Sequence, residues 1–235
     1  MKRPLLALAM LALGAGVAGA GVAGAQVTPK RFAVVTRLGA FSPEKAASQE
    51  LAGVIGLDAE YAFNKYFGLG TALDIGRGNT RREDFIQRLR FGNPAVAGGD
   101  TIYYQQLGQP VNTLNLTLFG SLRVPGKVSP YAVGGVGSYV LIMDALANGS
   151  TRYMSGMSLT GGAGVNIKFS EQYGIQFDVR ALQFQNFERA KLDPSDGRFP
   201  NVWFPEDLPT PPAAKNSVLN TTFTLGFRYV PGAGN

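Results

Sequence analysis

The sequence predicts an all-β protein: an eight-stranded antiparallel up-and-down transmembrane β-barrel with short periplasmic turns and long extracellular loops. Three observations predict this fold. Charged residues make up only 16% of the 235-residue chain, which also contains 31 glycines, whereas ordinary soluble domains have about 25% charged residues and about 7% glycine. Apolar and polar residues alternate along eight segments, and the connections between those segments alternate between short and long. Both patterns are typical of membrane barrels.

Residues 1–25 have the form of a secretory signal peptide, and residues 26–235 form the predicted barrel domain. Lys2 and Arg3 precede an apolar run, and small residues then offer a cleavage site after Ala25. No later stretch reaches the roughly 18 continuous apolar residues of a spanning helix. Cleavage would lower the formal net charge from +6 to +4, because Lys2 and Arg3 are lost. So weak a charge gives no reason to expect nucleic acid binding.

The eight predicted strands are each about ten residues long, the length that a tilted strand needs to cross a bilayer. In chain order they are 32–41, 54–63, 68–76, 114–124, 130–142, 158–169, 174–184 and 218–229. In six of them apolar and polar residues alternate regularly. One example is the run in which Leu114, Leu116 and Leu118 alternate with Asn115 and Thr117. The first and fifth segments alternate less cleanly, the fifth because several glycines thin it.

The connections between these segments divide into two kinds. Three are tight turns of four or five residues, at 64–67, 125–129 and 170–173. The others are much longer and mostly polar, at 42–53, 77–112, 143–157 and 185–217. A meander with short turns at one rim and long loops at the other matches a transmembrane barrel. With eight strands, both ends of the chain lie on the short-turn side.

Alternation alone does not distinguish a membrane barrel from a secreted ligand-binding barrel, but the charges do. The polar faces carry small residues and nine charged ones, at mid-strand or near the short turns. These four acids and five bases can neutralise one another inside a narrow barrel, and we expect them to form a lumen network of salt bridges. The network consists of Arg37, Asp58, Glu60, Asp74, Arg123, Lys168, Asp178, Arg180 and Arg228.

The opposite faces carry almost no charge and end in aromatic residues beside the short turns. Such a belt is typical of a membrane interface. Its expected members are Tyr61, Phe63, Tyr66, Phe67, Tyr131, Phe169, Tyr173, Phe227 and Tyr229. The sequence therefore favours a membrane barrel over a soluble one.

The composition argues against an enzyme. The chain contains no histidine and no cysteine, so Ser-His hydrolysis, imidazole or thiolate metal ligands and cysteine nucleophiles are excluded. The lumen acids could be imagined as catalytic carboxylate pairs, but salt bridges to the nearby bases are the favoured interpretation. We predict no catalytic residue, no cofactor and no metal.

The 77–112 connection is rich in arginine. Its REDFIQRLRF stretch (82–91) places Phe85, Ile86 and Leu89 near one helical face, so it predicts a short amphipathic helix. Its arginines could contact lipid phosphates at the outer rim, although a solvated loop is the favoured alternative. The residues proposed for this contact are Arg81, Arg82, Arg88 and Arg90.

Several stretches resemble the small outer-membrane β-barrel family, the group similar to the eight-stranded membrane domain of OmpA-type proteins. They are GLDAEYAFNKYFGLGTALD (56–74), SPYAVGGVGSYVL (129–141), GGAGVNIKFSEQYGIQFDVRA (161–181) and TFTLGFRYV (222–230). The resemblance implies a Gram-negative-type cell outer membrane and insertion by the barrel-assembly machinery. One departure is that residues 230–235 follow Tyr229, whereas the family commonly ends on an aromatic residue.

Two functions from different classes remain open. The first is a monomeric structural or interaction barrel, with a side-chain-filled lumen and long loops that contact outer-membrane lipids, including lipopolysaccharide. The second is a transporter-like barrel that passes small apolar molecules, or a narrow porin. A continuous apolar stripe on the lumen face, starting at the long-loop rim, would favour the second. The lumen faces are predicted to be mostly polar and small, which favours the first.

Overall fold

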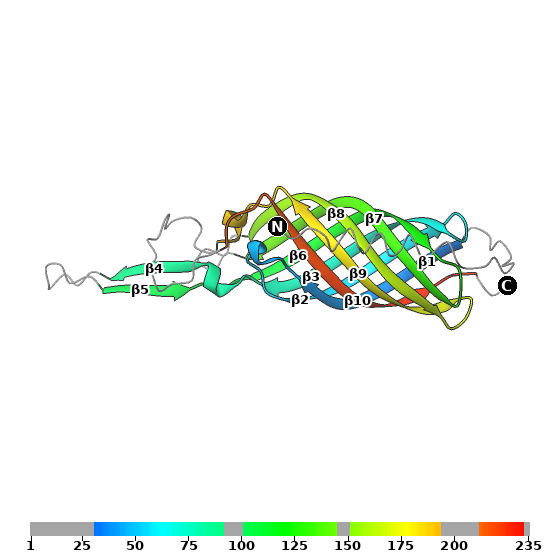
Figure 1. Cartoon of the computed structure of the whole chain (residues 1–235). Helices are drawn as coiled ribbons and strands as arrows, with labels where there is room; N and C mark the ends of the chain where they lie inside the picture. The colour runs from blue at the N-terminus through cyan, green and yellow to red at the C-terminus, as the bar shows by residue number, and fades with distance from the viewer. Residues whose placement is uncertain (1–30, 92–100, 145–150, 194–211, 233–235) are drawn as a thin grey trace.

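The computed structural model describes residues 31–91, 101–144, 151–193 and 212–232 of the chain (Figure 1). The predicted signal peptide lies outside these residues. Eight antiparallel strands form a closed barrel, in which each strand pairs with its neighbour along the chain and the first pairs with the last. The predicted eight-stranded antiparallel up-and-down barrel is confirmed. The barrel strands are β1 (Arg31–Ser42), β2 (Ala52–Ala62), β3 (Phe67–Asn79), β6 (Pro110–Arg123), β7 (Val128–Asp144), β8 (Thr151–Lys168), β9 (Tyr173–Gln185) and β10 (Ser217–Tyr229).

The barrel closes between β1 and β10, with a register that runs from Val34 opposite Tyr229 to Ser42 opposite Thr221. With this seam, each barrel strand has a hydrogen-bonded neighbour on both sides, as strands in hydrocarbon require. The start of β1 and the end of β10 therefore lie at the same end of the barrel, beside the short turns.

Polar side chains fix the short turns locally. In the turn between β2 and β3, the side-chain oxygen of Asn64 accepts hydrogen bonds from the backbone N–H groups of Tyr66 and Phe67, at 2.7 and 2.9 Å. Between β8 and β9, Ser170 Oγ accepts from the backbone of Gln172 and Tyr173 in the same way, at 3.2 and 3.1 Å. Asn and Ser are common in turns for this reason.

The arginine-rich segment is not a helix, and that prediction is wrong. After a single 3₁₀ turn, η2 (Arg82–Asp84), the chain forms β4 (Ile86–Phe91), which pairs with β5 (Thr101–Gln106) in a separate two-stranded sheet. The partner segment TIYYQQ is rich in β-branched and aromatic residues, which favour strands. Pairing with a segment further along the chain overrides the local helical periodicity. The hairpin extends away from the barrel at its long-connection end (Figure 1).

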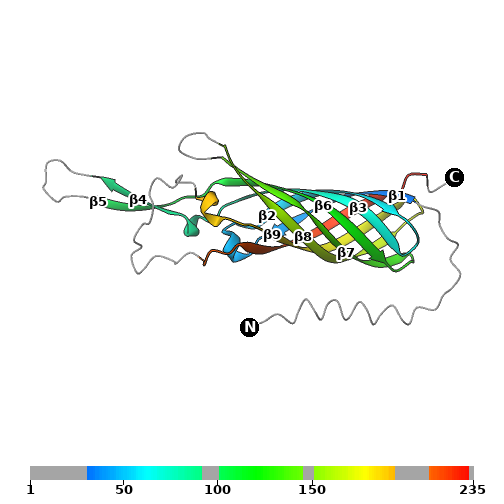
Figure 2. The same cartoon turned by 90° about the horizontal axis from the view of Figure 1, so that it is seen from above.

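The long connections are shorter than the sequence predicts. Strands β7 and β8 have 17 and 18 residues and pair from Val128 opposite Ile167 to Asp144 opposite Thr151. The predicted 143–157 loop therefore consists largely of strand, and both strands continue past the barrel end (Figure 2). Likewise, β3 and β6 take residues from both ends of the predicted 77–112 loop. Polar residues in these strand ends resemble loop residues because they extend beyond the apolar band.

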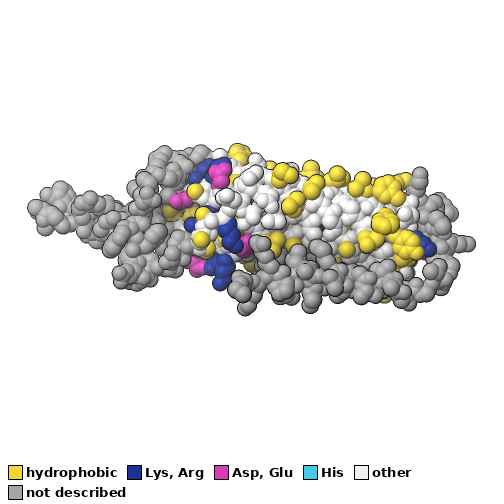
Figure 3. Space-filling view, turned by 45° about the horizontal axis from the view of Figure 1, so that its top comes forward, with side chains coloured by type: hydrophobic (Ala, Val, Ile, Leu, Met, Phe, Trp, Pro, Cys, Tyr) yellow, Lys and Arg dark blue, Asp and Glu magenta, His cyan; other side chains and the backbone are white. Residues whose placement is uncertain are grey.

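The outer wall is apolar. Leu38, Leu116 and Phe223 expose more than half of their surface on it, at 66%, 55% and 53%. Hydrophobic side chains lie along the wall, whereas Lys, Arg, Asp and Glu side chains gather at the long-connection end (Figure 3). Eight of the nine predicted belt aromatics are exposed near the short turns. Tyr131 is the exception, because it lies on the inner side of glycine-thinned β7 and is 8% exposed.

Candidate functional site

The barrel lumen holds a chain of buried ion pairs at mid-height. Arg37 Nη2 donates to Asp58 Oδ1 and to Asp74 Oδ1, both at 2.7 Å. Arg180 Nη2 donates to Asp58 Oδ2 at 2.6 Å and to Asp178 Oδ2 at 2.8 Å. These five side chains expose no more than 7% of their surface. Asp58 thus bridges two guanidinium groups that reach it from β1 and β9.

Two aromatic residues border this charged layer. The Tyr131 hydroxyl donates to Asp178 Oδ2 at 2.7 Å. The Arg180 guanidinium lies over the Phe119 ring, 5.5 Å from its centroid, within the range of a cation–π contact. The layer spans the lumen from Asp74 on β3 to Tyr131 on β7. Each of its charged side chains is buried and contacts another member of the layer.

Glycines on the lumen side give these large side chains their space. A Cβ at Gly56 would lie 2.8 Å from Arg37 Cζ, and one at Gly164 would lie 2.4 Å from the Tyr131 hydroxyl. Neither side chain could keep its place beside an alanine. Part of the high glycine content therefore follows from the size of the residues across the lumen.

A second charged cluster lies closer to the short turns. Arg123 and Ser121 both donate to Glu60 Oε1. Arg228 donates to Glu60 Oε2 at 3.0 Å. A small cavity of about 20 Å³ borders both clusters, room for about one water molecule. The lumen is therefore filled with side chains at this level.

Lys168 does not join either cluster. Its side chain is exposed at the short-turn mouth, and it has no carboxylate partner among the described residues. The structure thus brings together eight of the nine residues predicted for the lumen network, in two groups, and leaves the ninth at the rim.

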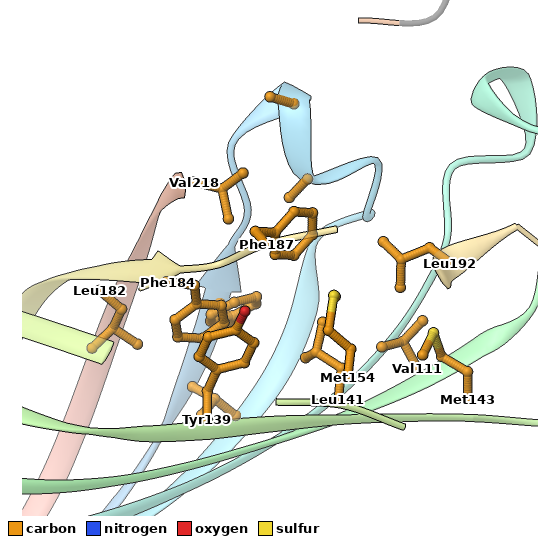
Figure 4. Packing of buried hydrophobic residues seen from close by; sticks show 14 of the residues in the cluster. Val111, Tyr139, Leu141, Met143, Met154, Leu182, Phe184, Phe187, Leu192 and Val218 are labelled. Carbon is orange, nitrogen blue, oxygen red and sulfur yellow. The ribbon is translucent and has the colours of Figure 1, made fainter. Parts of the chain in front are cut away.

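The long-connection half of the lumen is mostly apolar, which the sequence analysis did not predict. Tyr139 and Phe184 stack with ring centroids 4.1 Å apart and planes 9° apart. Around them a buried cluster fills the barrel end (Figure 4). Its members are Phe41, Ala46, Ala47, Val54, Phe85, Val111, Tyr139, Leu141, Met143, Met154, Leu182, Phe184, Phe187, Leu192 and Val218. The expectation of mostly polar and small lumen faces is wrong for this half.

Two short turns from the long connections close this apolar end. The 3₁₀ turn η1 (Lys45–Ala47) contributes Ala46 and Ala47, and η3 (Arg189–Leu192) contributes Leu192, which is fully buried. A sequence signal for the cluster did exist, since Leu182 and Phe184 follow Arg180 at inward spacing. Val111, Met143 and Met154 were hidden because their strand ends resemble loops.

The predicted lipid-phosphate contact lies at η2 and β4. Arg81 donates to Glu83 and has its Nε 3.9 Å from Asp84 Oδ2. Its charge is therefore engaged within its own turn. Arg82 is exposed, while the side chains of Arg88 and Arg90 lie outside the described part of the structure.

Neither a metal centre nor a membrane helix is found in the described residues. Within 31–91, 101–144, 151–193 and 212–232, no group of three or more acidic side chains could hold a metal ion. In the same ranges, no helix has the length and apolar character needed to cross a membrane.

A closed antiparallel barrel with an apolar wall, aromatic side chains near one rim and paired charges inside defines the class of transmembrane β-barrels. Residues 5–231 match the family described as "Outer membrane protein beta-barrel domain", and the chain belongs to this family. The outer membrane is the location that this membership indicates. No curated protein matches the chain.

Solved structures agree with this fold. Neisserial surface protein A superimposes with a TM-score of 0.52 at 12% identity, over 84% of this chain and 96% of that one. This likeness shows the fold alone. Ail of Yersinia pestis, in complex with the heparin analogue sucrose octasulfate, gives a TM-score of 0.47 at 12% identity, over 86% of this chain and 100% of that one. OprG of Pseudomonas aeruginosa gives 0.46 at 14% identity, over 86% and 97%.

Proposed function

We propose that this protein is a non-conducting outer-membrane barrel with a structural or interaction role. The observation that carries the proposal is closure of the lumen by two different layers in series. One layer is the buried chain of ion pairs centred on Asp58, and the other is the apolar cluster centred on Tyr139 and Phe184. An eight-stranded barrel has an interior that side chains can just fill. A diffusive pore would need both layers to open.

The long-connection end is the surface that we assign to the cell exterior and to partners. Charged side chains gather there, and the β4–β5 hairpin projects from it (Figures 1 and 3). In this proposal, arginine side chains at this end contact the phosphate groups of outer-membrane lipids, including lipopolysaccharide. In this proposal the barrel is a monomer, inserted by the barrel-assembly machinery, and has no catalytic role, since its lumen acids are held by guanidinium groups.

Single-channel recording tests the closed lumen. The refolded protein in a planar bilayer should show no discrete openings, because neither layer leaves a continuous water path. Folding is checked independently by the shift in gel mobility between heated and unheated samples. Reproducible openings from folded wild-type protein would contradict the proposal.

The apolar cluster supports one second candidate, passage of small apolar molecules through the outer half of the barrel. From the long-connection rim down to Leu182, most of the large buried side chains of the lumen are apolar, as such a route would need. Indole influx into liposomes distinguishes the candidates. The closed barrel predicts the same rate with and without protein, whereas acceleration by the folded barrel would favour transport.

A further inference from the structure

The short-turn mouth of the barrel contains a basic cavity that the proposed closed-lumen role does not use. The cavity has a volume of about 630 Å³ and is bounded by the three short turns and by Val230 after β10. This volume lies within the range of about 300–1,000 Å³ that is typical of small-molecule sites. At its inner end it shares Arg123, Asn166 and Arg228 with the small cavity beside the ion pairs.

The charge around this cavity is strongly positive. Among the described residues, its wall holds six bases and one acid, Glu171, which pairs with Arg31 at 2.9 Å and has a 74% exposed side chain. Glu60, just beneath the floor, is the next acid. Six bases against two acids leave a formal excess of four positive charges. The six bases are Arg31, Lys65, Arg123, Lys127, Lys168 and Arg228.

The floor carries part of this excess. Arg123 and Arg228 both bind the single carboxylate of Glu60. One guanidinium charge is therefore left without a counter-charge there. Arg123 Nε is buried and has no hydrogen-bond partner. A buried donor of this kind is costly unless an acceptor reaches it, and Arg123 lines both this cavity and the smaller one beneath it.

The rim carries the rest of the excess. Lys65 and Lys127 lie on two different turns, and Lys168 lies at the end of β8. None of the three has a carboxylate partner among the residues that the structure describes. They face one cavity with low-dielectric walls, where the fields of like charges add and favour a multivalent anion.

From these observations we propose that the short-turn mouth binds a small anion with two or more phosphate groups. Arginine forks match phosphate oxygens at the floor, and the lysines supply mobile point charges at the rim. A single monovalent anion would leave most of the excess charge unbalanced. The phosphates could come from a soluble compound or from a lipid headgroup that reaches over the rim, and the experiment separates these sources.

Calorimetric titration with inorganic pyrophosphate tests the site in the folded full-length barrel in uncharged detergent. Saturable 1:1 binding is expected, and the double variant Lys127→Gln/Lys168→Gln should bind at least tenfold more weakly. The matched control is Lys45→Gln/Lys191→Gln, which removes the same charge at the opposite end and should bind as wild type does. No saturable binding by wild type, or equal loss in both double variants, would overturn the proposal.

A second measurement needs no variant. Pyrophosphate should slow acetylation of Lys127 and Lys168 but not of Lys191, as read by mass spectrometry of the wild-type protein, and uniform rates would count against the site.

To find the source of the phosphates, the calorimetric titration is repeated in nanodiscs. Weaker pyrophosphate binding with cardiolipin, whose headgroup holds two phosphates, than with phosphatidylglycerol at equal bilayer charge identifies a lipid headgroup as the occupant, and equal binding identifies a soluble anion.

Discussion

At the scale of single residues, the lumen charges depend on one another for their stability. Arg180→Ala should lower the free energy of unfolding, because it removes the guanidinium partner of buried Asp178 and one of the two guanidinium partners of buried Asp58. Removal of one partner from a buried ion pair costs about 3–5 kcal/mol, and water entering the vacated space reduces that figure. Urea unfolding of the folded barrel in lipid vesicles measures the change.

The matched control is Lys191→Ala, which breaks an exposed pair with Glu188 at 3.1 Å. Exposed pairs contribute about 0–1 kcal/mol, so this variant should unfold close to wild type. Equal shifts in the two midpoints would contradict a stabilising role for the lumen ion pairs.

Single residues also mark the limit of sequence-based prediction. Alternation placed Asp58, Asp178 and Arg180 on the polar faces of their strands, because a strand has a side-chain period of two, and the balance of charges assigned those faces to the lumen. Alternation could not identify Asp58 as the bridge between Arg37 and Arg180, since that contact spans the lumen and exists only once the barrel has closed. Tyr131 was assigned to the wrong face because glycines around it remove the pattern.

At the scale of a strand, the two faces of β6 should respond oppositely to charge. Leu116→Arg places a cation on the lipid side and should destabilise the barrel by about 2–4 kcal/mol near the bilayer midplane. Thr117→Ser changes the adjacent lumen position and should cost much less. Both are measured by urea unfolding in vesicles. Similar costs for the two variants would argue for a soluble barrel.

The contact that the β1–β2 connection makes with Lys215 and the start of β10 should weaken at acidic pH. Burial of the Glu44 carboxyl opposes ionisation, but hydrogen bonds from Lys215 and from the backbone N–H of Leu219, together with the charge of Lys215, outweigh burial and lower the pKa of Glu44 below its ordinary value of 4.5. A lowered pKa in the folded state adds stability above the unfolded-state pKa, and this stability is lost as pH falls through the folded-state value.

Glu44→Gln should therefore lower the urea midpoint at neutral pH, and its effect should shrink as pH falls through the folded-state pKa of Glu44, because the carboxyl becomes protonated in both states. Glu50→Gln, an exposed change in the same connection, is the control and should leave the urea midpoint unchanged at every pH. A Glu44→Gln effect that is independent of pH would exclude this ionic link between the connection and β10.

Among the elements, the sequence predicted the barrel strands better than their ends. Each strand has a lipid-facing stripe that fixes its centre, but β7 and β8 continue as polar strand where no lipid requires apolar residues. The prediction of a helix in the arginine-rich segment was wrong for another reason. Its backbone partner lies ten or more residues further along the chain, beyond the window in which local periodicity is measured.

For the whole molecule, we expect the short turns to face the periplasm. The chain has no cysteine, so single cysteines can report position. Lys127→Cys should resist an impermeant maleimide in intact cells, whereas Lys191→Cys should be labelled, because these residues lie at opposite ends of the barrel. Both should react after the outer membrane is permeabilised. Labelling of Lys127→Cys in intact cells would reverse the orientation.

The seam between β1 and β10 has a consequence for biosynthesis. The contact that completes the cylinder joins the first and last strands of the barrel, so it has the greatest sequence separation in the sheet and cannot form until β10 has been translated. A chain that lacks the 13 residues of β10 would leave the edges of β1 and β9 unpaired. Hydrocarbon offers those backbone groups no hydrogen bonds. The last strand is therefore needed to give the other seven a closed set of backbone hydrogen bonds in the bilayer.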